Sequence, residues 1–260
     1  MNSTPSLGQD PPQAESNLPD QDPLTNDIFL GGGIRLRQPR HGYRFSIDAV
    51  ILAGSLHPRP GDSMVDLGTG CGIVPILLSH RWPSVRIWGV EVQAELAAVA
   101  VENVRTNAME PQVTILNADL RDVSAGLLGG PVDWVVANPP YRRGRSGRVN
   151  PNCQRALARH EIAMTLPDLV AAARRLLKTG GRFVAIYGAE RTADLLFHMR
   201  SGHIEPKRLQ AIQPDPQSNA RLILVEGIKD GKPGAALVPP LIIREGSGRY
   251  STEIDKMFSR

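Results

Sequence analysis

Short apolar runs alternate with longer stretches of helical periodicity along most of the chain. Seven runs of four to six residues are dominated by β-branched and other apolar side chains, as is typical of buried strands. Between most of these runs, apolar positions recur three and four residues apart, as in helices with one buried face. This alternation predicts an α/β domain with a mostly parallel sheet. The predicted strands are residues 64–67, 85–90, 113–116, 132–137, 183–187, 209–212 and 222–225.

Helix signals fall between these strands. Pro167 stands at the start of one periodic stretch, and Gly180-Gly181 follows its end, so a helix is expected between them. The last two predicted strands are close together in sequence and are expected as an antiparallel hairpin. The predicted helices are residues 73–80, 93–107, 166–178, 189–199 and a short final helix near 253–258.

The amino-terminal part has a different composition. Residues 1–27 are rich in Pro, Gln, Asn, Ser and Asp and have few large apolar residues, so they are predicted as a disordered acidic tail. Residues 28–260 are expected as one domain with a short amino-terminal strand and helix. Ile34 and Leu36 alternate with Arg35 and Arg37, which predicts a strand with one basic face.

Ser46 precedes an apolar helical run, with Asp48 two residues later. Two roles remain open for this pair. Ser46 is a suitable N-cap and Asp48 suits the first helical turn. A position facing a ligand is the alternative.

A glycine-rich turn follows the first strand of the predicted sheet. Gly68, Gly70 and Gly72 come directly after the apolar run that contains Asp66, and a helix is predicted next. Glycines between a strand and a helix let the backbone approach a ligand closely, as in Rossmann-like units. Residue 73 is Ile, so the Gly-x-Gly-x-x-Gly dinucleotide pattern is not met, and the chain has no P-loop.

Acidic residues follow the next two strands. Glu91 ends the second strand, 25 residues after Asp66, near the spacing at which an acid binds ribose hydroxyls. An exposed acid or an N-cap partner for the 93–107 helix is the structural alternative. Asp119-Leu120 follows the third strand, where the carboxylate could accept from an adenine amino group and Leu120 could cover a ring face. A turn aspartate is the alternative for Asp119.

The fourth strand ends in Asn138-Pro139-Pro140-Tyr141. Prolines cannot donate to a sheet ladder, so the strand stops here in a stiff turn at the carboxyl edge of the sheet. Asn138 Oδ1 and a proline carbonyl can accept both hydrogens of a planar amino group, and Tyr141 can stack on the attached ring. A strand-ending turn with a packed tyrosine is the alternative.

Charge favours an anionic partner. The whole chain has a net charge of +4 and a pI near 9.3. Without residues 1–27, which hold five acids and no Lys or Arg, 30 basic face 21 acidic residues, giving +9. This predicts a nucleic-acid partner, with a solvated charged surface as the alternative. The expected RNA contacts are Arg35 and Arg37 of the basic strand and the arginines of a Gly-containing loop, Arg142, Arg143, Arg145 and Arg148.

Several classes of protein are disfavoured. No apolar run approaches 18 residues, so no transmembrane helix is expected. The amino terminus lacks a basic region followed by an apolar one, and two cysteines fit a reducing compartment, so the cytoplasm is the expected location. No paired metal ligands stand out, and no metal site is predicted.

Taken together, the four motifs resemble those of class I S-adenosylmethionine-dependent methyltransferases that act on amino nitrogens. The resemblance implies a Rossmann-like fold with a seven-stranded, mostly parallel sheet, an antiparallel edge hairpin and helices on both faces. It also implies that S-adenosylmethionine is the cofactor. In that case Gly68 and Gly70 lie against the methionine part of the cofactor, and Thr69 belongs to the same cofactor-binding turn, which Asp66 supports. Glu91 then holds the ribose, and Asp119 and Leu120 face the adenine. Asn138 and Tyr141 hold the target, and Asn138 also lies beside the cofactor.

A closer resemblance is to the bacterial valine-tRNA adenine-N6 methyltransferases. It is carried by Phe45-Ser-Ile-Asp-Ala-Val, Ala158-Arg-His-Glu-Ile162, Glu205-Pro-Lys-Arg and the run from Val225 to Gly234. It implies an adenine in tRNA as the substrate. The alternatives are a protein glutamine, a DNA adenine or an rRNA guanine as methyl acceptor, or a non-catalytic RNA-binding module.

Overall fold

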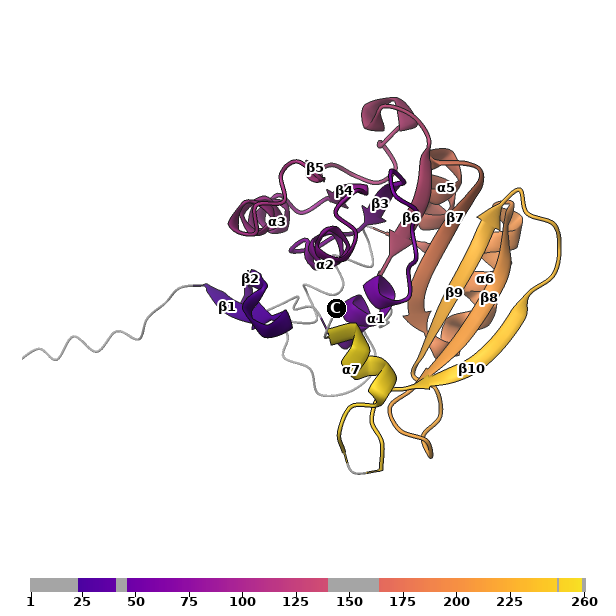
Figure 1. Cartoon of the computed structure of the whole chain (residues 1–260). Helices are drawn as coiled ribbons and strands as arrows, with labels where there is room; N and C mark the ends of the chain where they lie inside the picture. The colour runs from indigo at the N-terminus through magenta and orange to yellow at the C-terminus, as the bar shows by residue number, and fades with distance from the viewer. Residues whose placement is uncertain (1–22, 41–45, 140–163, 247, 259–260) are drawn as a thin grey trace, which may run out of the picture.

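A computed structural model describes residues 23–40, 46–139, 164–246 and 248–258 of the chain. These residues form an eight-stranded sheet flanked by helices, and a separate two-stranded hairpin (Figure 1). In chain order the elements are β1 (Leu24–Phe29), a 3-10 turn (Leu30–Gly32), β2 (Ile34–Pro39), α1 (Ile47–Gly54), β3 (Ser63–Leu67), α2 (Ile73–Arg81), β4 (Arg86–Glu91), α3 (Ala94–Thr106), β5 (Val113–Asn117), a 3-10 turn (Ala125–Leu128), β6 (Val132–Ala137), α5 (Leu166–Leu176), β7 (Leu177–Gly188), a 3-10 turn (Ala189–Arg191), α6 (Thr192–Ser201), β8 (Ile204–Gln213), β9 (Leu222–Lys229), β10 (Ala236–Ile242) and α7 (Thr252–Phe258).

The large sheet confirms the predicted fold class. Its strand order is β10-β8-β9-β7-β6-β3-β4-β5, and β9 runs antiparallel to both of its neighbours, β7 and β8. The expected number of seven strands was wrong, because β10 pairs with β8 as an eighth, parallel strand. This strand contains Pro239 and Pro240, and its register shifts between Val238 and Leu241. A proline pair in a sequence argues against a strand, but prolines are tolerated in a strand at the edge of a sheet.

Helices cover both faces of the sheet, as predicted. On one face α1, α2, α3 and α7 bury side chains such as Ile51, Ile76 and Ile254 in a common apolar core. On the other face α5 and α6 pack Leu169 and Leu195 into a second core. Figure 1 shows α2 and α3 beside the strands β3 to β5 and α5 and α6 beside β7 to β9. The sheet is therefore buried on two sides, which explains why its central strands are nearly all apolar.

The end of α5 differs from the prediction. The helix ends at Leu176, and β7 begins at Leu177 rather than near Phe183. Strand β7 pairs with β6 at Leu177 and again at Arg182, and the register of the two strands shifts between these two positions. Gly180 has a φ of +78°, a conformation open to glycine. The glycine pair therefore shapes an irregular strand instead of ending a helix.

The hairpin of β1 and β2 begins inside the predicted tail. Leu24 of β1 pairs with Pro39 of β2, so the predicted disorder through residue 27 was wrong for its last four residues. Within the hairpin, Gln38 donates a hydrogen bond to the Asp27 carboxylate at 2.7 Å. Residues 24–27 lack a continuous apolar run, and the pairing with β2 stabilises a strand that their composition does not predict.

Candidate active site

The site lies where the strand order of the sheet reverses. From β3 the chain proceeds to β4 and β5 on one side, whereas β6 lies on the other side of β3. Such a switch point opens a crevice at the carboxyl ends of the two central strands. Asp66 of β3 is paired with Val136 of β6. Gly68 and Asn138 each follow this pair by two residues, so the glycine-rich turn and the Asn-Pro turn meet at the same crevice.

The glycine-rich turn is anchored to β4. The backbone N–H groups of Gly68 and Thr69 both donate to the carbonyl of Val90 at 2.9 Å. Gly72 has a φ of +84°, and a Cβ at this position would lie only 3.1 Å from the Cβ of Ala100 on α3. The turn therefore requires glycine at residue 72 both for its backbone conformation and for its close contact with α3.

Glu91 clamps this turn to the start of α3. One oxygen of its buried carboxylate accepts from the N–H of Gly70, and the other accepts from the N–H of Gln93, each at 2.9 Å. Gln93 is the N-cap residue of α3, so the structural alternative considered for Glu91 is realised. Each carboxylate oxygen can accept a second hydrogen bond, which leaves capacity for ribose hydroxyls.

Asp66 is the most electrostatically perturbed group of the site. It is buried, and burial raises the pKa of its carboxyl to about 7, with the neighbouring Glu91 carboxylate adding to the rise. Within the described part of the chain, Asp66 Oδ2 and Thr69 Oγ1 are buried without a hydrogen-bond partner. Unpaired buried polar atoms carry a free-energy cost, and a cationic ligand in this crevice would lower it.

Asp119 lines a pocket that also includes residues of the glycine-rich turn and of the end of β4. Gly68, Glu91, Asp119, Leu120 and Met164 line it. Arg121 donates to both oxygens of the Asp119 carboxylate, and these hydrogen bonds lower the pKa of Asp119. A ligand amino group would therefore share this carboxylate with the Arg121 guanidinium.

Met164 was not identified from the sequence. Its methyl carbon lies 2.7 Å from where a Cβ on Gly68 would be, directly over the glycine-rich turn. No motif marks an isolated methionine, and only the folded chain brings residue 164 to residue 68.

These side chains fit S-adenosylmethionine. The cofactor carries an ammonium and a sulfonium, a ribose with two hydroxyls, and an adenine amino group. The buried Asp66 oxygen suits a cation, Glu91 suits the ribose hydroxyls, and Asp119 suits an amino donor. Leu120 and Met164 supply apolar walls for a ring.

The remaining predicted residues fall into four groups. Asn138 is half-buried at the end of β6, and its side chain has no hydrogen-bond partner among the described residues. Arg35 is exposed, whereas the Arg37 guanidinium is paired with Glu102 at 2.5 Å. Ser46 is at the N-cap position of α1, but its side chain makes no capping hydrogen bond. Predictions that lie outside the described residues concern Pro140, Tyr141, Arg142, Arg143, Arg145 and Arg148.

The described residues show neither a metal cluster nor a membrane-spanning helix. They contain no group of three or more His, Cys, Asp and Glu side chains arranged to hold a metal ion. Among the helices described, none is long and apolar enough to cross a membrane.

The fold and the glycine-rich turn beside Asn138 define a class I methyltransferase. The profile of the Methyltransferase small domain matches residues 44–199, and the chain belongs to that family. Membership confirms the predicted methyltransferase activity and S-adenosylmethionine as the cofactor.

Curated relatives resemble most of this chain in sequence, and a solved structure shares its fold. The chain is 28% identical to a tRNA1(Val) (adenine(37)-N6)-methyltransferase of Porphyromonas gingivalis, over 88% of this chain and 92% of the relative. A protein of the same description from Tolumonas auensis is 26% identical, over 83% and 88%. A crystal structure of a predicted O-methyltransferase from Agrobacterium tumefaciens superposes with a TM-score of 0.66 at 22% identity, covering 81% of this chain and 94% of that one.

Proposed function

We propose that this protein transfers a methyl group from S-adenosylmethionine to the N6 amino group of an adenine in tRNA. One observation carries the proposal: the half-buried Asn138 amide has no partner in the described structure and follows β6 beside the glycine-rich turn. A side-chain oxygen at this place suits an amino group presented to the cofactor. The relatives described as tRNA1(Val) (adenine(37)-N6)-methyltransferases support the substrate, as does the basic charge of residues 28–260.

The chemistry requires positioning more than a nucleophile supplied by the protein. S-adenosylmethionine supplies an electrophilic methyl group when bound. The adenine amino nitrogen is a weak nucleophile because its lone pair is delocalised into the ring. We assign Asn138 Oδ1 and the Pro139 carbonyl to accept its two hydrogens, which favours a more tetrahedral nitrogen. These acceptors also stabilise the positive charge that develops on the nitrogen during transfer.

The proposal assigns the other residues to binding. Tyr141 stacks on the splayed-out base, as is usual for single-stranded RNA. Asp66 and Glu91 orient the cofactor through its charged and hydroxyl groups, and Asp119 and Leu120 hold its adenine. The arginines at 142, 143, 145 and 148 are assigned to the phosphate backbone, together with Arg35. Arg37 is given a lesser part because Glu102 already pairs with it.

A methyl-transfer assay tests the proposal. The purified protein, labelled S-adenosylmethionine and a valine-tRNA transcript should yield N6-methyladenosine, identified by mass spectrometry of the digested RNA. Asn138→Ala should retain cofactor binding in calorimetry and lose most turnover, whereas Asn138→Asp keeps an acceptor oxygen and should retain more turnover. Methylation of DNA or of a glutamine peptide in place of tRNA would overturn the substrate. Full turnover by Asn138→Ala would overturn the mechanism.

A further inference from the structure

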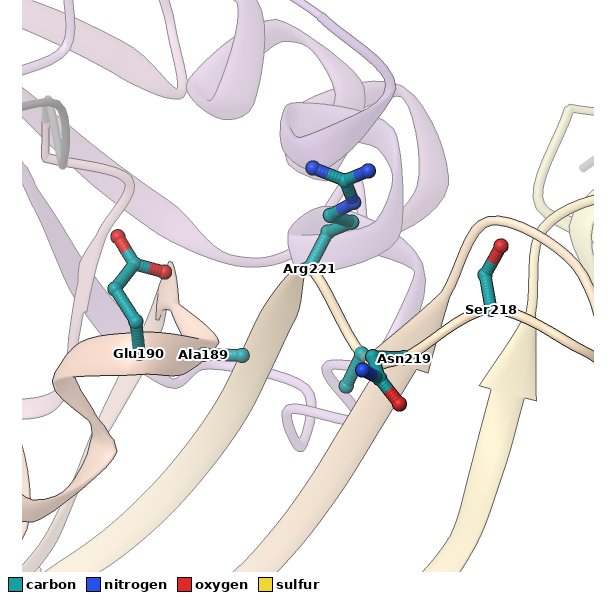
Figure 2. A pocket seen from close by; sticks show the side chains of 6 residues that line it. Ala189, Glu190, Ser218, Asn219 and Arg221 are labelled. Carbon is teal, nitrogen blue, oxygen red and sulfur yellow. The ribbon is translucent and has the colours of Figure 1, made fainter. Parts of the chain in front are cut away.

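A second pocket lies at the carboxyl edge of the sheet, away from the cofactor crevice. It has a volume of about 550 Å³, within the range of ligand sites. Ala189 and Glu190 contribute from the 3-10 turn that follows β7, and residues 218–221 contribute from the turn between β8 and β9. Figure 2 shows the Glu190 carboxylate, the Arg221 guanidinium and the Ser218 hydroxyl extending in one direction, with the Asn219 amide extending in the other.

The strand pairing places this pocket on the side of β6 that is opposite β3. Strand β7 is the neighbour of β6 on the side opposite β3, with Ala137 paired to Ala185. Three residues beyond Ala185, Gly188 pairs with Leu222, at the start of β9. A group held at Asn138 therefore has the cofactor crevice on one side and this pocket on the other.

The backbone around the pocket is fixed. Ala189 donates to the carbonyl of Arg221, and Arg221 donates to the carbonyl of Ile212, both at 3.0 Å. The Asp215 carboxylate accepts from the N–H and the hydroxyl of Ser218, at 3.0 and 2.6 Å. These bonds hold the turn without using the charged ends of Glu190 or Arg221.

The two charged side chains are free to bind a ligand. Both are exposed, and the described structure shows neither a hydrogen bond nor an ion pair for the Arg221 guanidinium or the Glu190 carboxylate. The Glu190 carboxylate bends over the end of β7, where its oxygen lies 2.8 Å from the place of a Cβ on Gly188. A guanidinium suits a phosphate, whereas a carboxylate repels one but accepts from base amino groups.

We propose that this pocket binds a nucleotide that neighbours the target adenine on the same RNA strand. Arg221 contacts its phosphate, and Glu190 accepts a hydrogen bond from the amino group of its base. A site that followed the backbone alone would place only cations here, so the acid indicates that a base is read. The inference rests on the proposed function, because it requires RNA as the substrate.

Steady-state methylation of the tRNA transcript tests the pocket. Arg221→Ala should raise the KM for tRNA about ten-fold, the effect of losing one charge-assisted contact. It should also reduce the slope of the logarithm of the RNA-binding constant against the logarithm of salt concentration by about 1, the value for one phosphate contact. Arg221→Lys should keep most of that salt dependence. Arg105→Ala, which removes an exposed arginine from α3, is the matched control and should leave KM unchanged.

Base reading is tested with altered transcripts. Each nucleotide beside the target is changed in turn between cytidine, which has an amino group, and uridine, which has none. The wild type should prefer cytidine at one position, and Glu190→Gln should lose that preference with the same affinity for the cofactor. If every Glu190 and Arg221 variant keeps the wild-type KM for tRNA and the wild-type preference for cytidine, the pocket does not bind a neighbouring nucleotide, but the proposed function stands. A wild-type protein that methylates no RNA would instead overturn the proposed function.

Discussion

The side-chain amide of Asn103 donates a hydrogen bond to the carbonyl oxygen of Cys71 at 2.9 Å. Cys71 lies within the glycine-rich turn, whereas Asn103 lies on α3 and is fully buried. The same side chain pairs with the backbone of Arg37, accepting from its N–H at 2.7 Å and donating to its carbonyl at 2.8 Å. One asparagine thus connects the amino-terminal hairpin, α3 and the cofactor turn.

Asn103→Ala should weaken cofactor binding as well as the fold. The variant leaves the Cys71 and Arg37 backbone groups without their partner, which should lower the free energy of unfolding by about 1–3 kcal/mol. It also frees the glycine-rich turn at Cys71, so the affinity for S-adenosylmethionine should fall about ten-fold. Urea unfolding and calorimetry measure the two effects.

Asn107 offers a matched control for this variant. It pairs with the backbone of Arg35 on the same strand, at 2.9 and 2.7 Å, but does not reach the glycine-rich turn. Asn107→Ala should therefore reduce stability and leave the affinity for the cofactor unchanged. Equal losses of affinity in both variants would show that the hairpin, and not the contact with Cys71, supports the turn.

Burial of Asp66 predicts an unusual dependence of stability on pH. Its pKa of about 7 in the folded protein is above the ordinary value of 3.8, so the folded state binds a proton that the unfolded chain releases. Asp66 therefore destabilises the folded state once its carboxyl group ionises. The free energy of unfolding of the cofactor-free protein should fall by up to roughly 4 kcal/mol as pH rises from 4 to above 7.

Asp66→Asn isolates this effect, since an amide does not titrate in this range. Urea unfolding of the wild type and the variant at pH 5, 6, 7 and 8 should show a downward slope in the wild type only. Parallel curves for the two proteins would mean that Asp66 is ionised throughout and that another group titrates.

Much of the site could be predicted because its signals are local. A glycine-rich turn after an apolar run, and an acid at or just after the end of each of the next two strands, are patterns that a short stretch of sequence shows. Asn103 carried no such signal. Its partners Arg37 and Cys71 are 66 and 32 residues away in sequence. Only the fold shows that a polar side chain on an apolar stripe acts as a connector.

The sheet shows the same division. The parallel strands were predictable because burial on both faces makes them apolar throughout. Strand β10 was not, since its burial pattern is mostly exposed and two prolines interrupt it. The place of Met164 was equally unpredictable, because its position over Gly68 depends on contacts that no sequence pattern specifies.

Glu91 should be required for cofactor binding for two reasons. Its carboxylate fixes the N–H groups of Gly70 and Gln93, and we assign its remaining capacity to the ribose hydroxyls. Glu91→Ala should reduce the affinity for S-adenosylmethionine about 10- to 100-fold, the loss expected for charged hydrogen bonds. Glu95→Ala, which removes an exposed acid from the first turn of α3, should have no effect in the same calorimetric titration. Comparable affinities in the wild type and Glu91→Ala would contradict the ribose assignment.

Two glycines of similar conformation separate backbone strain from close packing. Gly72 and Gly61 have φ values of +84° and +86°, so an alanine is strained at either position. At Gly61 a Cβ would meet nothing within 4 Å, whereas at Gly72 it would press on the Ala100 Cβ of α3. Gly61→Ala should therefore cost about 1 kcal/mol of stability from the backbone alone.

Gly72→Ala should lower the free energy of unfolding by about 1–3 kcal/mol more than Gly61→Ala does, because the glycine-rich turn and α3 must move apart. That movement also displaces the turn from the cofactor, so S-adenosylmethionine should bind more weakly to Gly72→Ala and normally to Gly61→Ala. Thermal unfolding with and without the cofactor measures both effects. If the two variants lose equal stability and the cofactor raises the melting temperature of each by the same amount, contact with α3 does not set the shape of the turn.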